Sequence, residues 1–333
     1  EPTGGERDCG QSGKPPKTPP GANEGKGYYH SYYFTSGLET LAMMTDYVSI
    51  SGDEKFRDEV MVPFARQVLR FYDTHYGRDA SGKIRLDPAQ SLETWWIAVN
   101  PAPDVAGLHF CLDALLAAKA GAAADQAAWR RMRAELPPVP LHEIDGRQAL
   151  APAAEFKARH NAENAELYPV FPFRCYGLAM GTEAIVDWTM QHRTNKDAFG
   201  SRCWTQDQID WALAGNAAEA AAGLVRRFRD ASMQCRFPMY GSAGPDSCPD
   251  FDHFGAGTTA LQRMLVQQAG EKILLLPAWP AGWDADFKLH LPGRTVVTGK
   301  VVGGKLTEWD ITPAARRKDV TVYQPQHPAA TTK

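Results

Sequence analysis

Apolar residues in most of the chain recur at the spacing of one face of an α-helix. One such stripe, with steps of three or four residues, comprises Phe56, Val60, Phe64, Val68 and Phe71. Similar stripes predict further helices over residues 38–48, 108–115, 129–136, 175–190, 206–214, 216–231 and 258–268. Asp104 is predicted to cap the helix that contains Leu108. The pattern therefore predicts a helical body over residues 28–270.

The pattern changes after Gly270, where helical stripes give way to short apolar or alternating runs. These runs cover residues 272–276, 287–291, 294–302 and 305–311, and Gly303-Gly304 has the composition of a hairpin turn. They predict a small antiparallel β-domain over residues 271–333. Residues 1–27 are rich in Gly, Pro, Lys and Glu and predict an irregular arm.

Composition narrows the classes of partner. The net charge is −3 without a basic stripe, which argues against a nucleic-acid partner, and no run of 18 apolar residues predicts a membrane span. The six cysteines lie singly without a C-x-x-C spacing, which argues against structural zinc, and Cys235 and Cys248 are the pair to test first for a disulfide. We expect a secreted or periplasmic protein, and since no signal peptide opens the sequence, a mature or trimmed product.

The segment Leu86–Leu108 concentrates the residue types of a carbohydrate site. Glu93 precedes Trp95 and Trp96, and Asn100 follows in a Pro-broken stretch. Aromatic faces stack on sugar rings, and apolar rings raise the pKa of a neighbouring carboxyl because desolvation disfavours its charge. A neutral carboxylic acid is what protonation of a glycosidic oxygen requires. The alternative is a buried Trp pair with Glu93 at the start of a helix.

A second polar segment runs from Arg159 to Pro169. It contains the candidate substrate ligands His160, Asn161, Glu163 and Glu166. Amides and carboxylates together suit sugar hydroxyls, which both donate and accept hydrogen bonds. The alternative is a solvated helix end. Two neighbouring ligands are too few for a metal site, so we expect neither a metal nor a cofactor.

A third segment, residues 245–255, carries three aspartates and a histidine. The order of its ligands differs from that of an EF-hand calcium loop. It instead suits a loop that leads into the helix beginning near Thr258, where the helix dipole would keep Asp252 ionised as a general base. Asp250 and His253 are neighbouring candidate ligands, and simple N-capping by an aspartate is the alternative.

Trp204 and Asp207 form a fourth, smaller candidate group. Asp207 could bind a sugar hydroxyl, and it could equally be an acidic residue in the first turn of a helix. Both residues are candidate substrate ligands.

Several of these sequence motifs, in this order, resemble those of glycoside hydrolase family 95. Ser91-Leu92-Glu93, Glu166-Leu167-Tyr168-Pro169, residues 254–268 and the L-L-L-P-A-W-P stretch at residues 274–280 correspond to segments of that family. The similarity is strongest to a less characterised branch with the motifs E-T-W-W, N-P-x-P-D-V-A-G-L and E-L-Y-x-V-F-P. It covers roughly residues 28–320.

The resemblance implies an (α/α)6 toroid with a C-terminal β-domain. It also implies inverting hydrolysis of an α-linked L-sugar such as L-fucose or L-galactose, in an oligosaccharide or polysaccharide. Glu93 falls on the general acid of the family, and Asp252 falls on the Asp that helps to activate water. We therefore expect Glu93, Trp95, Asn161, Glu163 and Asp252 to line one cleft.

The sequence also departs from the family. Asn161, Glu163 and Glu166 stand where the family has histidines, and an upstream Asn pair that positions water has no counterpart. A complete toroid with an N-terminal β-domain needs more than 333 residues. The chain would then be a fragment, or an incomplete barrel that another chain completes. A non-catalytic carbohydrate-binding remnant of the scaffold is the alternative to an enzyme, and a polysaccharide lyase using His160 and Tyr168 is a weaker one.

Overall fold

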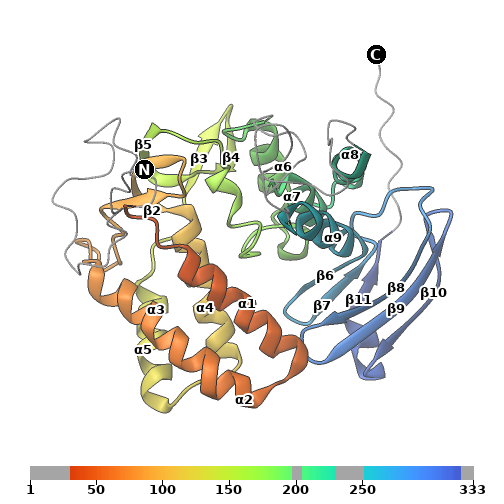
Figure 1. Cartoon of the computed structure of the whole chain (residues 1–333), viewed down its shortest axis with the longest axis horizontal. Coiled ribbons are helices and arrows are strands. Elements are labelled where there is room, and N and C mark those ends of the chain that lie inside the picture. Colours follow the sequence, from red (N-terminus) through yellow and green to blue (C-terminus); the bar gives the residue numbers. More distant parts are fainter. Residues whose placement is uncertain (1–30, 197–204, 230–250, 324–333) are drawn as a thin grey trace, which may run out of the picture.

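The computed structural model describes residues 31–196, 205–229 and 251–323 (Figure 1). Helices dominate its first part, as the sequence predicts. They are α1 (Ser36–Ser51), α2 (Glu54–Phe56), a π-helical turn (Arg57–Met61), α3 (Val62–His75), α4 (Ala102–Ala117), α5 (Ala123–Glu135), α6 (Glu183–His192), α7 (Asp207–Leu213), α8 (Ala217–Arg229) and α9 (Phe251–Leu265).

Helices α1, α3, α4 and α5 surround one hydrophobic core. Leu41 of α1 and Leu112 of α4 are fully buried in it. On α3 the buried face comprises Val62, Ala65, Leu69 and Tyr72. This face lies one residue along from the predicted stripe, whose phenylalanines pack at the edge of the core instead. The helix was predicted correctly, and its buried face was not.

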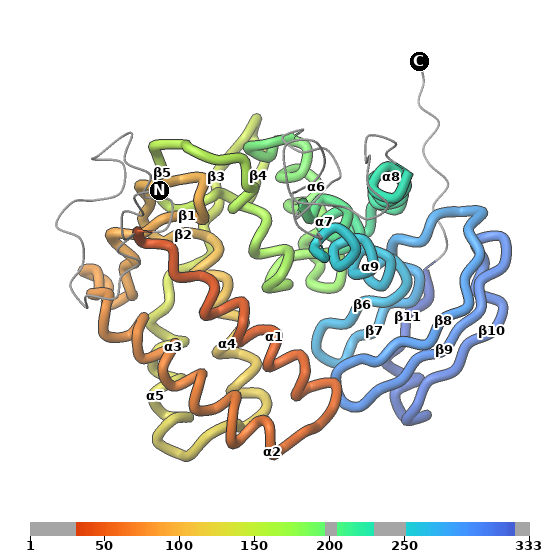
Figure 2. The backbone as a smooth tube through the Cα atoms, viewed as in Figure 1, coloured from red at the N-terminus to blue at the C-terminus, as the bar shows by residue number. Residues whose placement is uncertain are grey.

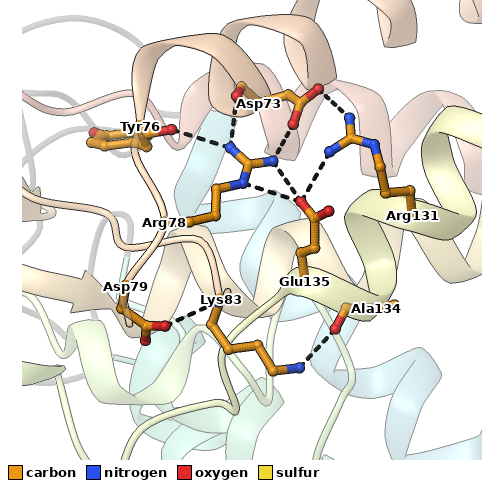
Figure 3. Close-up of polar contacts among 8 residues, drawn as sticks. All are labelled: Asp73, Tyr76, Arg78, Asp79, Lys83, Arg131, Ala134 and Glu135. Carbon is orange, nitrogen blue, oxygen red and sulfur yellow. Dashed lines mark hydrogen bonds and ion pairs between the residues drawn. The ribbon is translucent and has the colours of Figure 1, made fainter. Parts of the chain in front are cut away.

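A network of charged side chains fixes the end of α3 against α5 (Figure 3). Arg78, just after α3, donates to the Asp73 carbonyl oxygen over 2.8 Å and to Glu135 Oε2 over 2.7 Å. Arg131 of α5 completes the network through Asp73 Oδ2 at 2.6 Å and Glu135 Oε2 at 2.9 Å. Because each carboxylate serves two guanidinium groups, the network orients the helices better than an isolated surface pair would.

A small sheet interrupts the helical region, where the sequence predicted only links between helices. Its strands are β1 (Ala89–Ser91), β2 (Trp95–Pro101) and β5 (Ala153–Arg159), and β3 (Leu141–Ile144) pairs with β4 (Arg147–Leu150) as a separate hairpin. Residues 95–99 are aromatic or aliphatic, a composition that suits a half-buried strand. The nearby prolines had suggested a broken link.

The C-terminal strands follow α9 without a linker and form two three-stranded sheets. They are β6 (Val266–Ala269), β7 (Lys272–Leu275), β8 (Ala285–Leu291), β9 (Thr295–Val302), β10 (Lys305–Thr312) and β11 (Val320–Val322). The hairpin at Gly303-Gly304 is confirmed, since both glycines have positive φ and Lys305 pairs with Val302.

Two details of this domain were predicted wrongly. Strands begin at Val266 rather than residue 271, and β11 runs parallel to β7. The parallel pairing is possible because β8, β9, β10 and a 3-10 helix, Ala314–Asp319, lie between β7 and β11, a connection far longer than a tight turn.

A second core joins α6, α7, α8 and α9 to the C-terminal sheets (Figure 2). The helices in the described ranges are fewer than the twelve of a closed (α/α)6 ring, so the complete toroid stays a prediction. No described helix is both long and apolar enough to span a bilayer. The arm predicted at residues 1–27 lies outside the described residues.

We predict that Leu41→Ala lowers the free energy of unfolding by about 2–5 kcal/mol, because it leaves a cavity in the first core. Met43→Ala is the matched control on the same helix, since Met43 is 65% exposed, and should change stability by about 0.5 kcal/mol or less. Urea denaturation of both variants measures the difference. Equal losses would contradict this packing.

Candidate functional site

The pairing of β2 with β5 brings two distant polar segments together. Trp95 lies opposite Arg159 in the antiparallel register. The residues just before β2 therefore face those just after β5. The backbone N–H of His160 donates to the Thr94 carbonyl over 2.8 Å, and that of Glu163 donates to Thr94 Oγ1 over 2.9 Å.

Glu93, Asn161 and Glu163 are hydrogen-bonded to one another at this point. The side-chain amide of Asn161 donates to Glu93 Oε2 over 2.7 Å. The backbone N–H of Glu93 donates to Glu163 Oε2 over 2.8 Å. Three of the residues predicted to line one cleft are thus in contact, although they come from segments about 70 positions apart. We call Glu93 and Glu163 the acid pair.

The surroundings of Glu163 raise its pKa to about 7. Burial is the largest cause, and the nearby charge of Glu93 adds to it, whereas hydrogen bonds from the Glu93 backbone and Thr94 oppose it. Among described residues, the partners of its carboxyl all use Oε2. Glu163 is therefore a carboxylic acid that retains its proton close to neutral pH, with Oε1 as the oxygen left for a substrate.

Aromatic rings border the acid pair. Trp96 stacks on His160 with ring centroids 3.6 Å apart and planes 19° apart, and its Nε1 donates to the Glu93 carbonyl over 2.9 Å. Burial, with the charge of Glu39 as the next cause, raises the pKa of Tyr33 and of Tyr168. The phenols near the acid pair are therefore neutral hydroxyl groups, which can donate hydrogen bonds.

Asp104 does not cap α4, contrary to the prediction. The helix begins at Ala102 after Pro101, and Asp104 is buried in its first turn. Its carboxylate accepts hydrogen bonds from Thr35 Oγ1 over 2.8 Å and from the Tyr72 hydroxyl over 2.5 Å. Burial raises its pKa to about 7. Pro101 and Pro103 mark the start of the helix. The Asp104 carboxyl is therefore not needed as a cap, and its hydrogen bonds from Thr35 and Tyr72 connect α4 with α1 and α3.

Trp95 lies on the other face of β2 from Trp96, because successive side chains of a strand point to opposite faces. It lines a cavity with Glu166, whose Oε1 accepts a hydrogen bond from the Thr194 backbone over 2.5 Å. Asp207, in the first turn of α7, pairs with Arg193 over 2.7 Å. Glu166 and Asp207 were candidate sugar ligands, and their described contacts connect them with α6 and not with the acid pair.

Asn100 stabilises the backbone at the end of β2. Its φ of 50° lies in the left-handed region, and its Oδ1 accepts a hydrogen bond from the Leu86 backbone over 2.8 Å. Its own N–H donates to the Leu86 carbonyl over 3.0 Å. The side chain therefore holds the backbone of the preceding segment, although it was a candidate substrate ligand.

Asp252 lies in the first turn of α9, because this helix begins at Phe251 and not near Thr258 as predicted. Its side chain is exposed, and α9 packs on α7, α8 and β6. His253 is buried, and its Nε2 lies 2.9 Å from the Arg227 carbonyl of α8. The shared cleft of Glu93 and Asp252 stays a prediction, and Trp204 and Asp250 lie outside the described residues.

Sequence reasoning missed Glu39, Tyr33 and Arg193. Glu39 lies within the apolar stripe of α1, and burial raises its pKa while a hydrogen bond from Tyr168 lowers it. A carboxyl inside an apolar stripe was the available signal. Little in the sequence indicated a role for Arg193, because its pairing with Asp207 is seen only in the tertiary structure.

A larger cavity of about 1000 Å³ lies beside α1, α4 and the turn after β6. None of the predicted site residues lines it. Four of its charged residues form two ion pairs, Asp46 with Arg174 at 2.6 Å and Asp113 with Arg133 at 2.7 Å. This mutual pairing leaves the acid pair as the stronger candidate for chemistry.

No group of three or more described His, Cys, Asp or Glu residues could hold a metal ion. Cys111 and Cys175 are free thiols. Cys235 and Cys248, the pair proposed for a disulfide, lie outside the described residues.

No family model and no curated protein matches the sequence. Among solved structures, the chain is similar to a candidate kojibiose phosphorylase from the human microbiome, with 9% sequence identity and a TM-score of 0.48. The similarity covers 81% of this chain and 45% of that one, so the chain spans less than half the length of this neighbour. Membership of family 95 stays a prediction that rests on the sequence motifs.

We predict that the Glu163 carboxyl titrates with a midpoint near 7 and that Glu93→Gln lowers this midpoint, because the variant removes a like charge. Carbon-13 NMR of the side-chain carboxyls measures both values. A midpoint near 4.5 in the unmodified protein would contradict the environment described for Glu163.

The same shift predicts a pH dependence of stability. Between pH 4.5 and about 7 the folded protein keeps a proton on Glu163 that the unfolded chain has released. The contribution to the free energy of unfolding is therefore complete below pH 4.5 and is lost as the pH rises toward 7. Glu163→Gln should make this decline shallower in urea titrations across that range. An unchanged slope would exclude Glu163 as a source.

Proposed function

We propose that the chain is a carbohydrate-active enzyme that cleaves a glycosidic bond, with Glu93 and Glu163 as its acid pair. The observation that carries this proposal is the raised pKa of Glu163 beside a second carboxyl residue. Acid-assisted cleavage requires a carboxylic acid that keeps its proton near neutral pH and a second carboxyl group in the same site.

The proposed step begins with the proton on Glu163. This carboxyl donates it to the oxygen of the leaving sugar while the glycosidic bond breaks, and the positive charge that develops on the sugar ring is stabilised by nearby carboxylates. The Asn161 amide orients the Glu93 carboxylate through its hydrogen bond to Oε2. The resemblance to family 95 instead gives the proton-donor role to Glu93, and the two assignments predict different variants to fail.

We expect Glu163→Gln to slow cleavage of an aryl glycoside with a poor leaving group by about 10²–10⁴-fold, because such a group departs only when protonated. A good leaving group needs little protonation and should lose far less. The rate should also fall above about pH 7, where Glu163 releases its proton. A panel of aryl α- and β-glycosides, including α-L-fucosides and α-L-galactosides, measures these effects.

Two variants sharpen this experiment. Glu155→Gln is the matched control, since Glu155 lies on the same strand β5 with an exposed side chain and should keep full activity. If Glu93→Gln shows the leaving-group dependence and Glu163→Gln does not, the proton donor is Glu93. A protein that binds the sugars without cleaving any glycoside would favour the non-catalytic remnant.

The stereochemistry belongs to the same proposal. We propose inversion at an α-linked L-sugar, with Asp252 activating the attacking water. Its support is the family resemblance, together with the place of Asp252 in the first turn of α9, where the helix dipole favours an ionised carboxylate. Inverting enzymes separate their two carboxyl groups by roughly 6.5–9.5 Å to admit the water.

Proton NMR of the first-formed product should show an anomeric configuration opposite to that of the substrate. Asp252→Asn should reduce the rate for good and poor leaving groups alike, because both need an activated water. A product that keeps the substrate's configuration would remove Asp252 from the role of water activation.

A further inference from the structure

A small cavity of about 230 Å³ lies behind β2, on the side away from Trp96. Trp95 and Phe156 of neighbouring strands form one wall, with ring centroids 4.8 Å apart. Glu166 and the end of α6, at His192 and Arg193, form another. The β3–β4 hairpin also lines the cavity, which is thus built from segments far apart in the chain.

Three of the residues that line the cavity hold buried polar atoms that have no hydrogen-bond partner within the described part of the chain. The atoms are Trp95 Nε1, Glu166 Oε2 and Arg193 Nε. Glu166 is only 3% exposed, so bulk water does not readily serve its free oxygen. Leaving a buried polar group unpaired costs about 1–3 kcal/mol, so three such groups in residues that line one cavity need an explanation.

We propose that this cavity binds a single neutral sugar ring, at a site separate from the acid pair. Two of the unpaired atoms are N–H donors and the third is a carboxyl oxygen. Glu166 Oε2 accepts a hydrogen bond when the carboxyl is ionised and donates one when it is protonated, and a hydroxyl group can serve it in either state as well as accept from the two N–H groups. The Trp95 and Phe156 rings add the apolar surface that the C–H face of a pyranose needs.

The charges at the cavity disfavour an ionic ligand. Asp207 already neutralises Arg193 over 2.7 Å, which weakens the attraction of this guanidinium for an anion. A metal ion is disfavoured because the described residues offer no group of three ligands there. Burial raises the pKa of Glu166, which keeps this carboxyl neutral over a wider pH range and weakens its attraction for an ammonium group.

The size of the cavity limits the ligand to one ring. Pockets for drug-sized ligands span roughly 300–1000 Å³, and a water molecule in the liquid occupies about 30 Å³. The 230 Å³ here exceed the space of a few waters and fall short of that needed for a sugar chain. The site therefore suits a free monosaccharide or one terminal residue.

This site does not depend on the proposed cleavage, since Trp95, Glu166 and Arg193 do not belong to the acid pair. Saturation-transfer NMR and tryptophan fluorescence of the whole chain can follow binding of L-fucose, L-galactose, D-glucose and D-galactose. Gluconate and glucosamine serve as the charged comparisons. We expect at least one neutral sugar to bind more tightly than both charged compounds.

Trp95→Phe keeps an aromatic ring and removes the N–H donor, and Glu166→Gln keeps the shape and changes the carboxyl. Each should weaken binding by about fivefold, the equivalent of one hydrogen bond. Trp309→Phe is the matched control, because Trp309 lies on β10 in the C-terminal sheet. The melting temperature of each variant verifies folding.

Three outcomes would overturn the proposal. One is that no neutral sugar binds, and another is that gluconate or glucosamine binds more tightly than every neutral sugar. The third is that binding survives both Trp95→Phe and Glu166→Gln and is lost in Glu163→Gln, which would place the sugar at the acid pair. Loss of glycoside cleavage alone would leave this second site standing, because the readout is binding.

Discussion

The antiparallel pairing of β2 with β5 is the constraint on which the rest of the site depends. It places Glu93 beside Asn161 and Glu163, and the contact of these carboxyl residues contributes to the raised pKa of Glu163. The same strand sends Trp96 to His160 and Trp95 to the small cavity. Backbone hydrogen bonds hold this arrangement, so it does not depend on the long side chains that it positions.

Helix α1 supplies the second support of the acid pair. Its Glu39, which is partly buried, accepts a hydrogen bond from Tyr168, and Thr35, just before the helix, donates one to Asp104 of α4. Asp104 and Glu163 both have a pKa of about 7, so the region between α1 and β2 carries two protons at mildly acidic pH. Burial is the largest cause of the raised pKa at both residues. The packing around these carboxyls therefore helps to set their protonation.

Local signals in the sequence predicted much of the fold. Helices α7 and α8 and the hairpin at Gly303-Gly304 follow from spacing and turn residues alone. The strand β2 was missed because two adjacent tryptophans and flanking prolines concealed its alternation. The start of α9 was missed because Gly255 and Gly257 lower helix propensity. In the folded protein, packing on α7 and α8 stabilises the helix across these glycines. Glu93 and Glu163 could be grouped from composition, but the part played by Glu39 required the tertiary contacts.

The alternation of β2 also constrains how the chain can vary in evolution. A slip of one residue in its pairing with β5 would exchange the two faces, so Trp95 and Trp96 would swap surroundings in a single event. Insertions inside either strand should consequently be rare among descendants of this sequence. The turns between these strands, at residues 118–122 and 145–146, are free of that restriction, because they can change in length while the register stays fixed. Divergence should therefore accumulate there first.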